Sequence, residues 1–256
     1  MAKRENSAKT PNETLDVLFE GGVNLFQSRT GYRFSIDSLL LAYFVVIRPG
    51  DRIVDLGTGN GIIPLVLARR HSSATVTGIE LQSTMVERAL RNVRLNELEA
   101  RIKIISGDVR TRKNFPGAAS ADVVVCNPPY RKPGSGRISA DDERQIARHE
   151  TSGDLREFLG AAAFLLRNKG RMALVYTVER CADLFYALRQ ARLEPKRLRM
   201  VHSFRDVEAS LVLVESVKGG RPGLTVEQPL TIYRRGKEYS AEVAAMVTGK
   251  QLHLPR

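Results

Sequence analysis

The stretch that decides the fold of this 256-residue chain reads Ile53-Val54-Asp55-Leu56-Gly57-Thr58-Gly59-Asn60-Gly61-Ile62-Ile63-Pro64. An apolar run leads into three glycines at alternate positions, and a second apolar run with an early proline follows. Glycine permits a sharp turn and close approach of a ligand, while proline is tolerated in the first turn of a helix. The pattern predicts a buried strand, a tight turn and a helix.

The spacing of these glycines argues against two common phosphate-binding loops. Ile62 stands where the dinucleotide fingerprint G-x-G-x-x-G/A requires glycine or alanine, and no lysine follows as in a P-loop. A tight turn without any ligand remains an alternative at this point.

Strands and helices alternate outward from this turn. We expect strands at 52–56, 75–79, 102–106, 123–126 and 172–176, and helices at 62–70, 84–98, 155–166 and 182–191. Repeated βαβ units require right-handed crossovers, so the fold class is α/β with a doubly wound, mainly parallel sheet. Two further strands, 198–202 and 209–217, have no helix between them and predict an antiparallel C-terminal hairpin at the sheet edge.

The domain organisation follows from the same pattern. We expect residues 1–13 to form a flexible basic tail and residues 14–256 to form a single domain. Within it, residues 14–50 are expected to be a helical lead-in, because apolar residues recur at helical spacing over 31–46. Residues 51–217 then form the core and residues 218–256 a C-terminal extension.

The composition narrows the class of partner. Lysine and arginine total 40 against 28 acidic residues, for a formal net charge of +12, which attracts polyanions such as nucleic acid. A basic surface that serves only solubility is the alternative. No apolar run is long enough to span a bilayer and no secretory signal opens the chain, so we expect a cytoplasmic protein. Cys126 and Cys181 fit no metal-binding spacing, so no metal is expected.

Three acidic residues follow successive predicted strands. Asp55 precedes the glycine turn, Glu80 ends the strand 75–79, and Asp108 follows the strand 102–106. Open α/β sheets bind ligands in the crevice at the carboxyl ends of their strands. The sequence therefore predicts a ligand site there, in which Glu80 is able to accept hydrogen bonds from the hydroxyls of a ribose.

The tetrapeptide Asn127-Pro128-Pro129-Tyr130 follows the next strand. Consecutive prolines fix the backbone, so the Asn127 side chain and the Pro128 carbonyl are rigidly aimed. Two such acceptors suit an exocyclic amino group, whose lone pair is delocalised and must be held in line with an electrophile. Tyr130 offers a flat face for a planar base. A rigid polar turn with an exposed tyrosine is the alternative.

A basic loop follows Tyr130. Its cations suit phosphate groups beside the target base, although a solvated loop explains each of them equally well. The candidate RNA contacts are Arg131, Lys132, Arg137, Arg148 and His149.

With these motifs the chain resembles the class I S-adenosylmethionine-dependent methyltransferases, whose sheet has seven strands. The resemblance implies that Asp55 and the backbone of Gly57, Gly59 and Gly61 hold the methionine part of the cofactor, with Asp37 near it. It further implies Glu80 on the ribose, Asp108 on the adenine amino group, and Asn127 beside both cofactor and acceptor.

Several families share the N-P-P-Y turn, including DNA adenine, RNA guanine-N2 and release-factor glutamine methyltransferases. Residues 31–42, the glycine turn, N-P-P-Y and Ala147-Arg148-His149-Glu150 most resemble the bacterial tRNA adenine-N6 methyltransferases, which modify adenine 37 of a valine tRNA. That resemblance implies S-adenosylmethionine as cofactor, tRNA as partner and a monomer without membrane attachment. Guanine-N2 methylation in rRNA, glutamine methylation and an inactive RNA-binding module remain alternatives.

Overall fold

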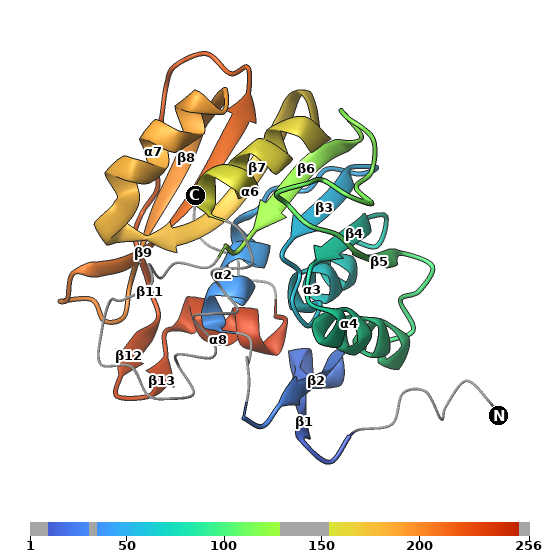
Figure 1. Cartoon of the computed structure of the whole chain (residues 1–256). Coiled ribbons are helices and arrows are strands. Elements are labelled where there is room, and N and C mark those ends of the chain that lie inside the picture. The colour runs from blue at the N-terminus through green and yellow to red at the C-terminus, as the bar shows by residue number, and fades with distance from the viewer. Residues whose placement is uncertain (1–9, 31–34, 129–153, 251–256) are drawn as a thin grey trace.

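A twisted sheet with helices on both faces forms the body of the protein (Figure 1). The computed structural model describes residues 10–30, 35–128 and 154–250. Among these residues the sheet has nine strands in the order β10-β8-β9-β7-β6-β3-β4-β5, with β11 also paired to β8. Its strands are β3 (Arg52–Leu56), β4 (Thr75–Glu80), β5 (Ile102–Ser106), β6 (Ala121–Cys126), β7 (Leu166–Thr177), β8 (Leu193–His202), β9 (Ala209–Lys218), β10 (Thr225–Val226) and β11 (Leu230–Thr231).

The sheet is parallel from β7 to β5, and β9 runs antiparallel to both β7 and β8. The expected α/β fold, doubly wound and mainly parallel with an antiparallel C-terminal hairpin, is confirmed. The seven expected strands correspond to β3–β9, and the two-residue strands β10 and β11 extend the sheet beyond β8. The outermost strands on this side of the sheet are therefore β10 and β11, and not the β8–β9 hairpin.

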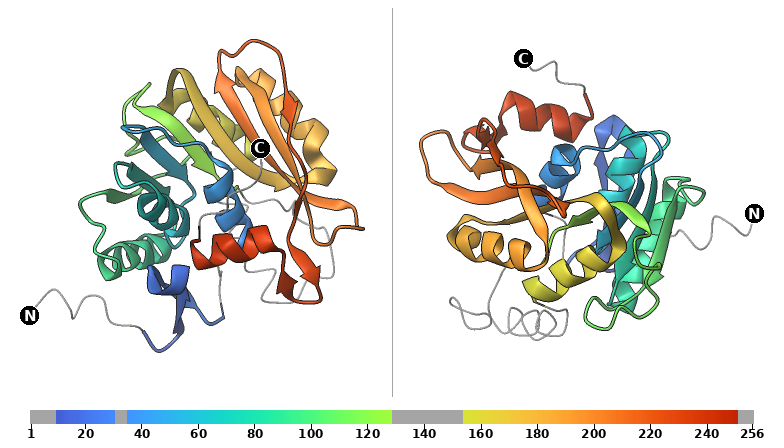
Figure 2. Two further views of the ribbon diagram at one scale, coloured as in Figure 1. Left: turned by 180° about the vertical axis from the view of Figure 1, so that it is seen from behind. Right: turned by 90° about the horizontal axis from the view of Figure 1, so that it is seen from above.

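Two hydrophobic clusters cover the two faces of the sheet. Helices α2, α3, α4 and α8 bury their apolar residues in one cluster, and α6 and α7 bury theirs in the other. Figure 2 shows α8 next to α2 in both views, and the two helices are in contact. The helices are α2 (Ile36–Phe44), α3 (Ile62–Arg70), α4 (Ser83–Leu95), α6 (Leu155–Leu165), α7 (Cys181–Gln190) and α8 (Ala241–Thr248), with short 3-10 helices η1 (Phe19–Gly21) and η2 (Val178–Arg180).

The N-terminal segment corrects one expectation. The helical lead-in predicted for residues 14–50 is wrong for its first half, because β1 (Glu13–Leu18) and β2 (Val23–Ser28) form an antiparallel hairpin. Among the described residues of this segment, α2 is the only α-helix, and η1 is a single short 3-10 turn. The predicted tail, residues 1–13, lies largely outside the described residues, and Glu13 itself belongs to β1.

Asn92 of α4 and Asn96, the residue that caps the C-terminus of this helix, hold the hairpin in place. The Asn92 side chain accepts from the Phe26 N–H at 2.7 Å and donates to the Phe26 carbonyl at 3.2 Å. Asn96 does the same with Asn24, at 2.8 and 2.7 Å. Four helical residues rise about 6 Å and two strand residues about 6.6 Å, so the spacings of helix and strand match. The two asparagines thereby provide hydrogen-bond partners for backbone groups on the edge of β2 that does not face β1.

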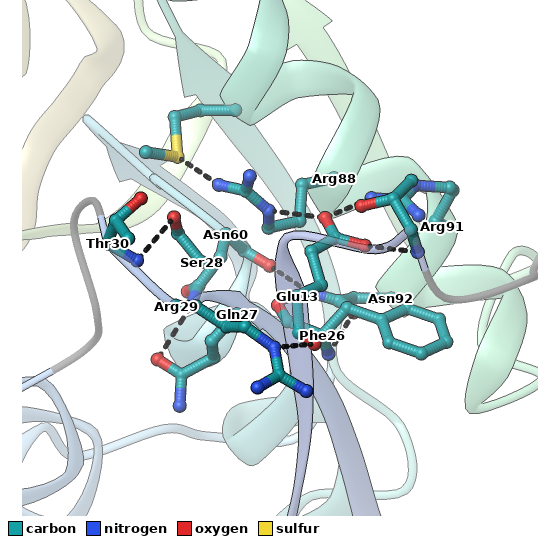
Figure 3. A network of polar contacts seen from close by, with 12 residues as sticks. Glu13, Phe26, Gln27, Ser28, Arg29, Thr30, Asn60, Arg88, Arg91 and Asn92 are labelled. Atoms are coloured by element: carbon teal, nitrogen blue, oxygen red, sulfur yellow. Dashed lines mark hydrogen bonds and ion pairs between the residues drawn. The ribbon is translucent and has the colours of Figure 1, made fainter.

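The same network reaches the glycine turn (Figure 3). The Asn92 amide also donates to the Asn60 carbonyl at 2.9 Å. Beside it, the buried Glu13 carboxylate accepts from Arg88 and Arg91. Burial alone would raise the pKa of Glu13, but the hydrogen bonds from the two guanidinium groups outweigh it and lower the pKa to about 2. The hairpin is thus fixed to α4 by ion pairs and by amide hydrogen bonds.

We expect Asn92→Ala to lower the free energy of unfolding by at least about 3 kcal/mol, because it leaves three buried backbone groups without partners at roughly 1–3 kcal/mol each. Urea denaturation measures this loss, and hydrogen exchange over residues 13–28 should accelerate. Asn24→Ala is the matched control, since Asn96 binds the backbone of Asn24 and not its side chain. A loss below about 0.5 kcal/mol for Asn92→Ala would contradict this role.

Candidate functional site

The glycine turn lies at the carboxyl end of β3. Gly57, Gly59 and Gly61 have positive φ angles of 71°, 56° and 86°, which other residues rarely adopt. The N–H groups of Gly57 and Thr58 both donate to the Ile79 carbonyl, at 2.9 and 3.0 Å. The sequence pattern is therefore explained by backbone conformation, and the turn is fastened to β4.

Asp55 is fully buried at the base of this turn. Its exposed fraction is 0%, and neither carboxylate oxygen has a hydrogen-bond partner among the described residues. Burial, with a further contribution from the nearby Glu80, raises the pKa of Asp55 to about 7, although the close approach of the Thr58 hydroxyl opposes that rise. A buried carboxylate without a partner is costly, so a ligand that donates hydrogen bonds or carries positive charge fits here.

Two further polar atoms of the turn are in the same situation. Thr58 Oγ1 and Asn60 Oδ1 are buried without a hydrogen-bond partner in the described part of the chain. Unsatisfied buried polar groups are rare in folded proteins. Their concentration beside Asp55 and three positive-φ glycines matches a cradle for a polar ligand better than it matches an ordinary turn.

Glu80 ends β4 and is tied to the turn. Its two carboxylate oxygens accept from the Gly59 N–H and the Gln82 N–H, each at 2.9 Å. Burial raises the pKa of Glu80, which is 8% exposed. Since each carboxylate oxygen has two lone pairs, Glu80 keeps capacity for ligand hydroxyls while its position is fixed by the backbone.

Asp108 is held by a partner that sequence reasoning missed. Arg110, two residues on, donates to both carboxylate oxygens, with Nη2 at 2.7 Å and Nε at 3.0 and 3.1 Å. Hydrogen bonding from Arg110 lowers the pKa of Asp108. The close spacing of an acid and an arginine was the available signal. In this structure the Asp108 carboxylate is engaged with a side chain of its own loop.

Asn127 lies directly after β6 and contacts α2. Its Nδ2 donates to the Ser38 hydroxyl at 2.9 Å, and Ser38 is only 2% exposed. This bond fixes which way the amide faces, with Nδ2 toward α2. Sequence reasoning missed Ser38, although a serine inside the apolar run of α2 was a visible signal. Neighbouring Asp37 is partly buried, and burial raises its pKa.

Strand register brings these groups to one edge. Leu56 pairs with Cys126 on one side and with Ile79 on the other, so Asn127, Gly57 and Glu80 stand next to one another. Glu80 in turn pairs with Ser106, two residues before Asp108. The predicted crevice thus gathers side chains from β6, β3, β4 and β5, in that order. The buried Pro128 follows Asn127.

The other predicted site residues lie outside the described residues. They are Tyr130, Arg131, Lys132, Arg137, Arg148 and His149. Within residues 10–30, 35–128 and 154–250, no group of three or more histidine, cysteine, aspartate or glutamate side chains is arranged to hold a metal ion. None of the helices described there is both long and apolar enough to cross a membrane.

Comparison with known proteins identifies the class. Residues 33–185 match the family model described as methyltransferase small domain. Among solved structures, one described as a predicted O-methyltransferase from Agrobacterium tumefaciens superposes with a TM-score of 0.68 at 25% identity, covering 84% of this chain and 96% of that one. TYW2 of Pyrococcus horikoshii, solved in complex with MeSAdo, has a TM-score of 0.57 at 18% identity, covering 82% and 73%.

Sequence relatives narrow the class further. The chain is 31% identical over 229 residues to a tRNA1(Val) (adenine(37)-N6)-methyltransferase of Tolumonas auensis, covering 86% of this chain and 90% of the relative. A protein of that name from Porphyromonas gingivalis is 33% identical over 195 residues, covering 74% and 76%. The fold, the site and the family model define a methyltransferase. The chain belongs to the tRNA1(Val) (adenine(37)-N6)-methyltransferase family, which confirms the resemblance seen in its sequence.

Proposed function

We propose that this protein transfers a methyl group from S-adenosylmethionine to N6 of adenine 37 in a valine tRNA. The observation that carries the proposal is the placement of Asn127, fixed by Ser38 and adjacent to the glycine turn, at the edge that also holds the unpartnered Asp55 carboxylate. The names of the relatives support adenine 37 of a valine tRNA as the methyl acceptor. The reaction takes place in the cytoplasm, and the protein acts as a monomer without a metal.

The residues of the turn fit the cofactor. Asp55 and the backbone of Gly57, Gly59 and Gly61 hold its methionine part, because a buried acceptor without a partner suits an ammonium group. Asp37 lies toward the same end. When bound, S-adenosylmethionine supplies an electrophilic methyl group on a sulfonium centre.

Glu80 and Asp108 hold the nucleoside part in this proposal. Glu80 accepts from the ribose hydroxyls, and its fixation by the Gly59 N–H keeps that distance constant. Asp108 accepts from the adenine amino group. Because Arg110 now occupies both oxygens of Asp108, cofactor binding requires Arg110 to share or release one of them.

Asn127 and Pro128 position the acceptor. The Asn127 Oδ1 and the Pro128 carbonyl each accept one hydrogen of the adenine amino group, which directs its lone pair toward the cofactor. Such in-line positioning accounts for about 7–11 kcal/mol of a barrier in favourable cases. Tyr130 stacks on the base, and Arg131, Lys132, Arg137, Arg148 and His149 contact the surrounding phosphates. The methylated amine loses its proton to water, so no strong general base is assigned.

Incubation with labelled S-adenosylmethionine and unmodified tRNA, followed by nucleoside mass analysis, tests the proposal. We expect N6-methyladenosine in a valine tRNA and nowhere else, because the acceptor turn binds an exocyclic amine and the relatives carry that name. An adenine-37-to-guanine transcript is the matched control and should take up no label. N2-methylguanosine in the tRNA would establish guanine-N2 methylation instead, and the absence of label from tRNA would contradict the proposal.

Ser38→Ala tests how Asn127 is positioned. Without the Ser38 hydroxyl the amide loses one contact that orients it, so we expect kcat to fall about 10- to 100-fold, with little change in the Kd of S-adenosylmethionine measured by calorimetry. Ser38→Thr keeps the hydroxyl and should recover part of the rate. Asn127→Ala should abolish transfer while cofactor binding survives. A parallel loss of cofactor affinity in Ser38→Ala would show a general structural defect instead.

A further inference from the structure

A second feature of the carboxyl edge is a short hairpin that the reaction does not use. It consists of β12 (Tyr233–Arg235) and β13 (Glu238–Tyr239), paired antiparallel, and we call residues 233–239 the β12–β13 hairpin. Figure 1 shows it beside α8, projecting from the main sheet. Gly236, with a φ of 55°, makes its turn.

The β12–β13 hairpin is anchored to the carboxyl end of β8. Ile232 N–H donates to the His202 carbonyl at 2.8 Å, and Tyr233 N–H donates to the Ser203 carbonyl at 2.9 Å. On its other side, Arg199 of β8 forms a two-pronged ion pair with Glu242 of α8, at 2.6 and 2.8 Å. The base of the hairpin is therefore held from both sides.

Strand direction places this anchor at the edge where the methyl acceptor binds. β7 is parallel to β6, β9 is antiparallel to β7, and β8 is antiparallel to β9, so β8 and β6 run in the same direction. The carboxyl ends of β8 and β6 therefore share one edge. They are three strand spacings apart, or about 14 Å, which corresponds to about four phosphates along one strand of a duplex.

Aromatic rings stiffen the base of the hairpin. The rings of Tyr233 and Tyr239 stack with centroids 5.4 Å apart and an interplanar angle of 12°. Phe204, from the loop after β8, lies 5.6 Å from Tyr233. A stack of this kind costs little further entropy when a partner binds, because its rings are already ordered.

Cations concentrate at the tip. Arg234, Arg235 and Lys237 are all exposed, as is Arg205 in the loop beside them. The acids nearby are Asp206, Glu208 and Glu238, and the Arg234–Glu238 pair is only a 4.0 Å contact between exposed groups. Exposed pairs of this kind contribute little, so these cations remain available to a polyanion.

We propose that the β12–β13 hairpin binds the phosphate backbone of the substrate RNA a few nucleotides from the methylated adenine. This inference rests on the proposed function for the identity of the RNA. These contacts position the RNA without recognising its sequence, because contacts between cations and phosphates do not depend on the bases. The proposal also assigns a role to the C-terminal extension, residues 218–256. This RNA contact is separate from the one proposed for the basic loop after Tyr130.

The triple variant Arg234→Ala, Arg235→Ala, Lys237→Ala tests the proposal. We expect the Kd for a fluorescent valine tRNA transcript to rise at least tenfold at about 0.15 M salt, and the slope of log K against log salt to become shallower by about two to three. In turnover assays KM for tRNA should rise with little change in kcat. These side chains are exposed and Gly236 is retained, so the thermal unfolding midpoint should stay within about 2 °C.

The matched control removes three exposed cations from other parts of the surface, Lys103→Ala, Arg189→Ala and Arg221→Ala. It has the same net charge as the hairpin variant, and its tRNA affinity should change less than threefold. If tRNA affinity fell equally in both variants, the effect would come from net charge alone and the proposal would be overturned. Unchanged tRNA affinity in the hairpin variant would also overturn it. Because Kd is measured without turnover, this result is independent of whether the wild-type protein methylates the transcript.

Discussion

The structure depends on one buried carboxylate. Asp55 is 0% exposed and has no hydrogen-bond partner among the described residues, and its pKa rises to about 7. A rise of roughly three pKa units corresponds to about 4 kcal/mol against the ionised form. The fold bears that penalty at the point where β3 meets the glycine turn. A ligand that donates a hydrogen bond to this carboxylate offsets the penalty, as the cofactor does in the proposed function.

Parallel strand register makes the site from residues far apart in sequence. Neighbouring strands carry Asn127, Gly57 and Glu80 at adjacent positions, so the groups proposed to hold the cofactor and the acceptor lie next to one another. The N-terminal segment completes the site in two ways. Ser38 orients Asn127, and the hairpin of β1 and β2 reaches the Asn60 carbonyl through Asn92. The lead-in is thus a structural part of the candidate site.

Local signals in the sequence predicted most of the core. Strand 52–56 and helix 62–70 have the bounds expected, because both are apolar and end at glycine or charged residues. The N-terminal hairpin could not be predicted in this way. Its β1 buries Glu13, which pairs with arginines more than seventy residues away. A strand with a buried acid has no apolar alternation to reveal it.

Strand extents were missed for related reasons. β8 begins at Leu193, five residues before the expected start, and carries Pro195 next to a register shift in its pairing with β9. Proline within a strand argues against that assignment unless a bulge accommodates it. In the site, the residue types and their edge were predictable, but the Ser38–Asn127 bond and the Arg110–Asp108 pair depend on tertiary packing. Whether each site residue performs its proposed role stays a prediction.

Proton release on cofactor binding tests the central claim most directly. An ammonium group beside Asp55 favours the ionised carboxylate, so binding must expel the proton that Asp55 carries below pH 7. Calorimetry with S-adenosylhomocysteine at pH 6, in two buffers of different ionisation enthalpy, should detect proton release that approaches one proton per ligand. Release should be near zero at pH 8 and should disappear in Asp55→Asn. Binding at pH 6 without proton release, or unchanged release in Asp55→Asn, would contradict the account.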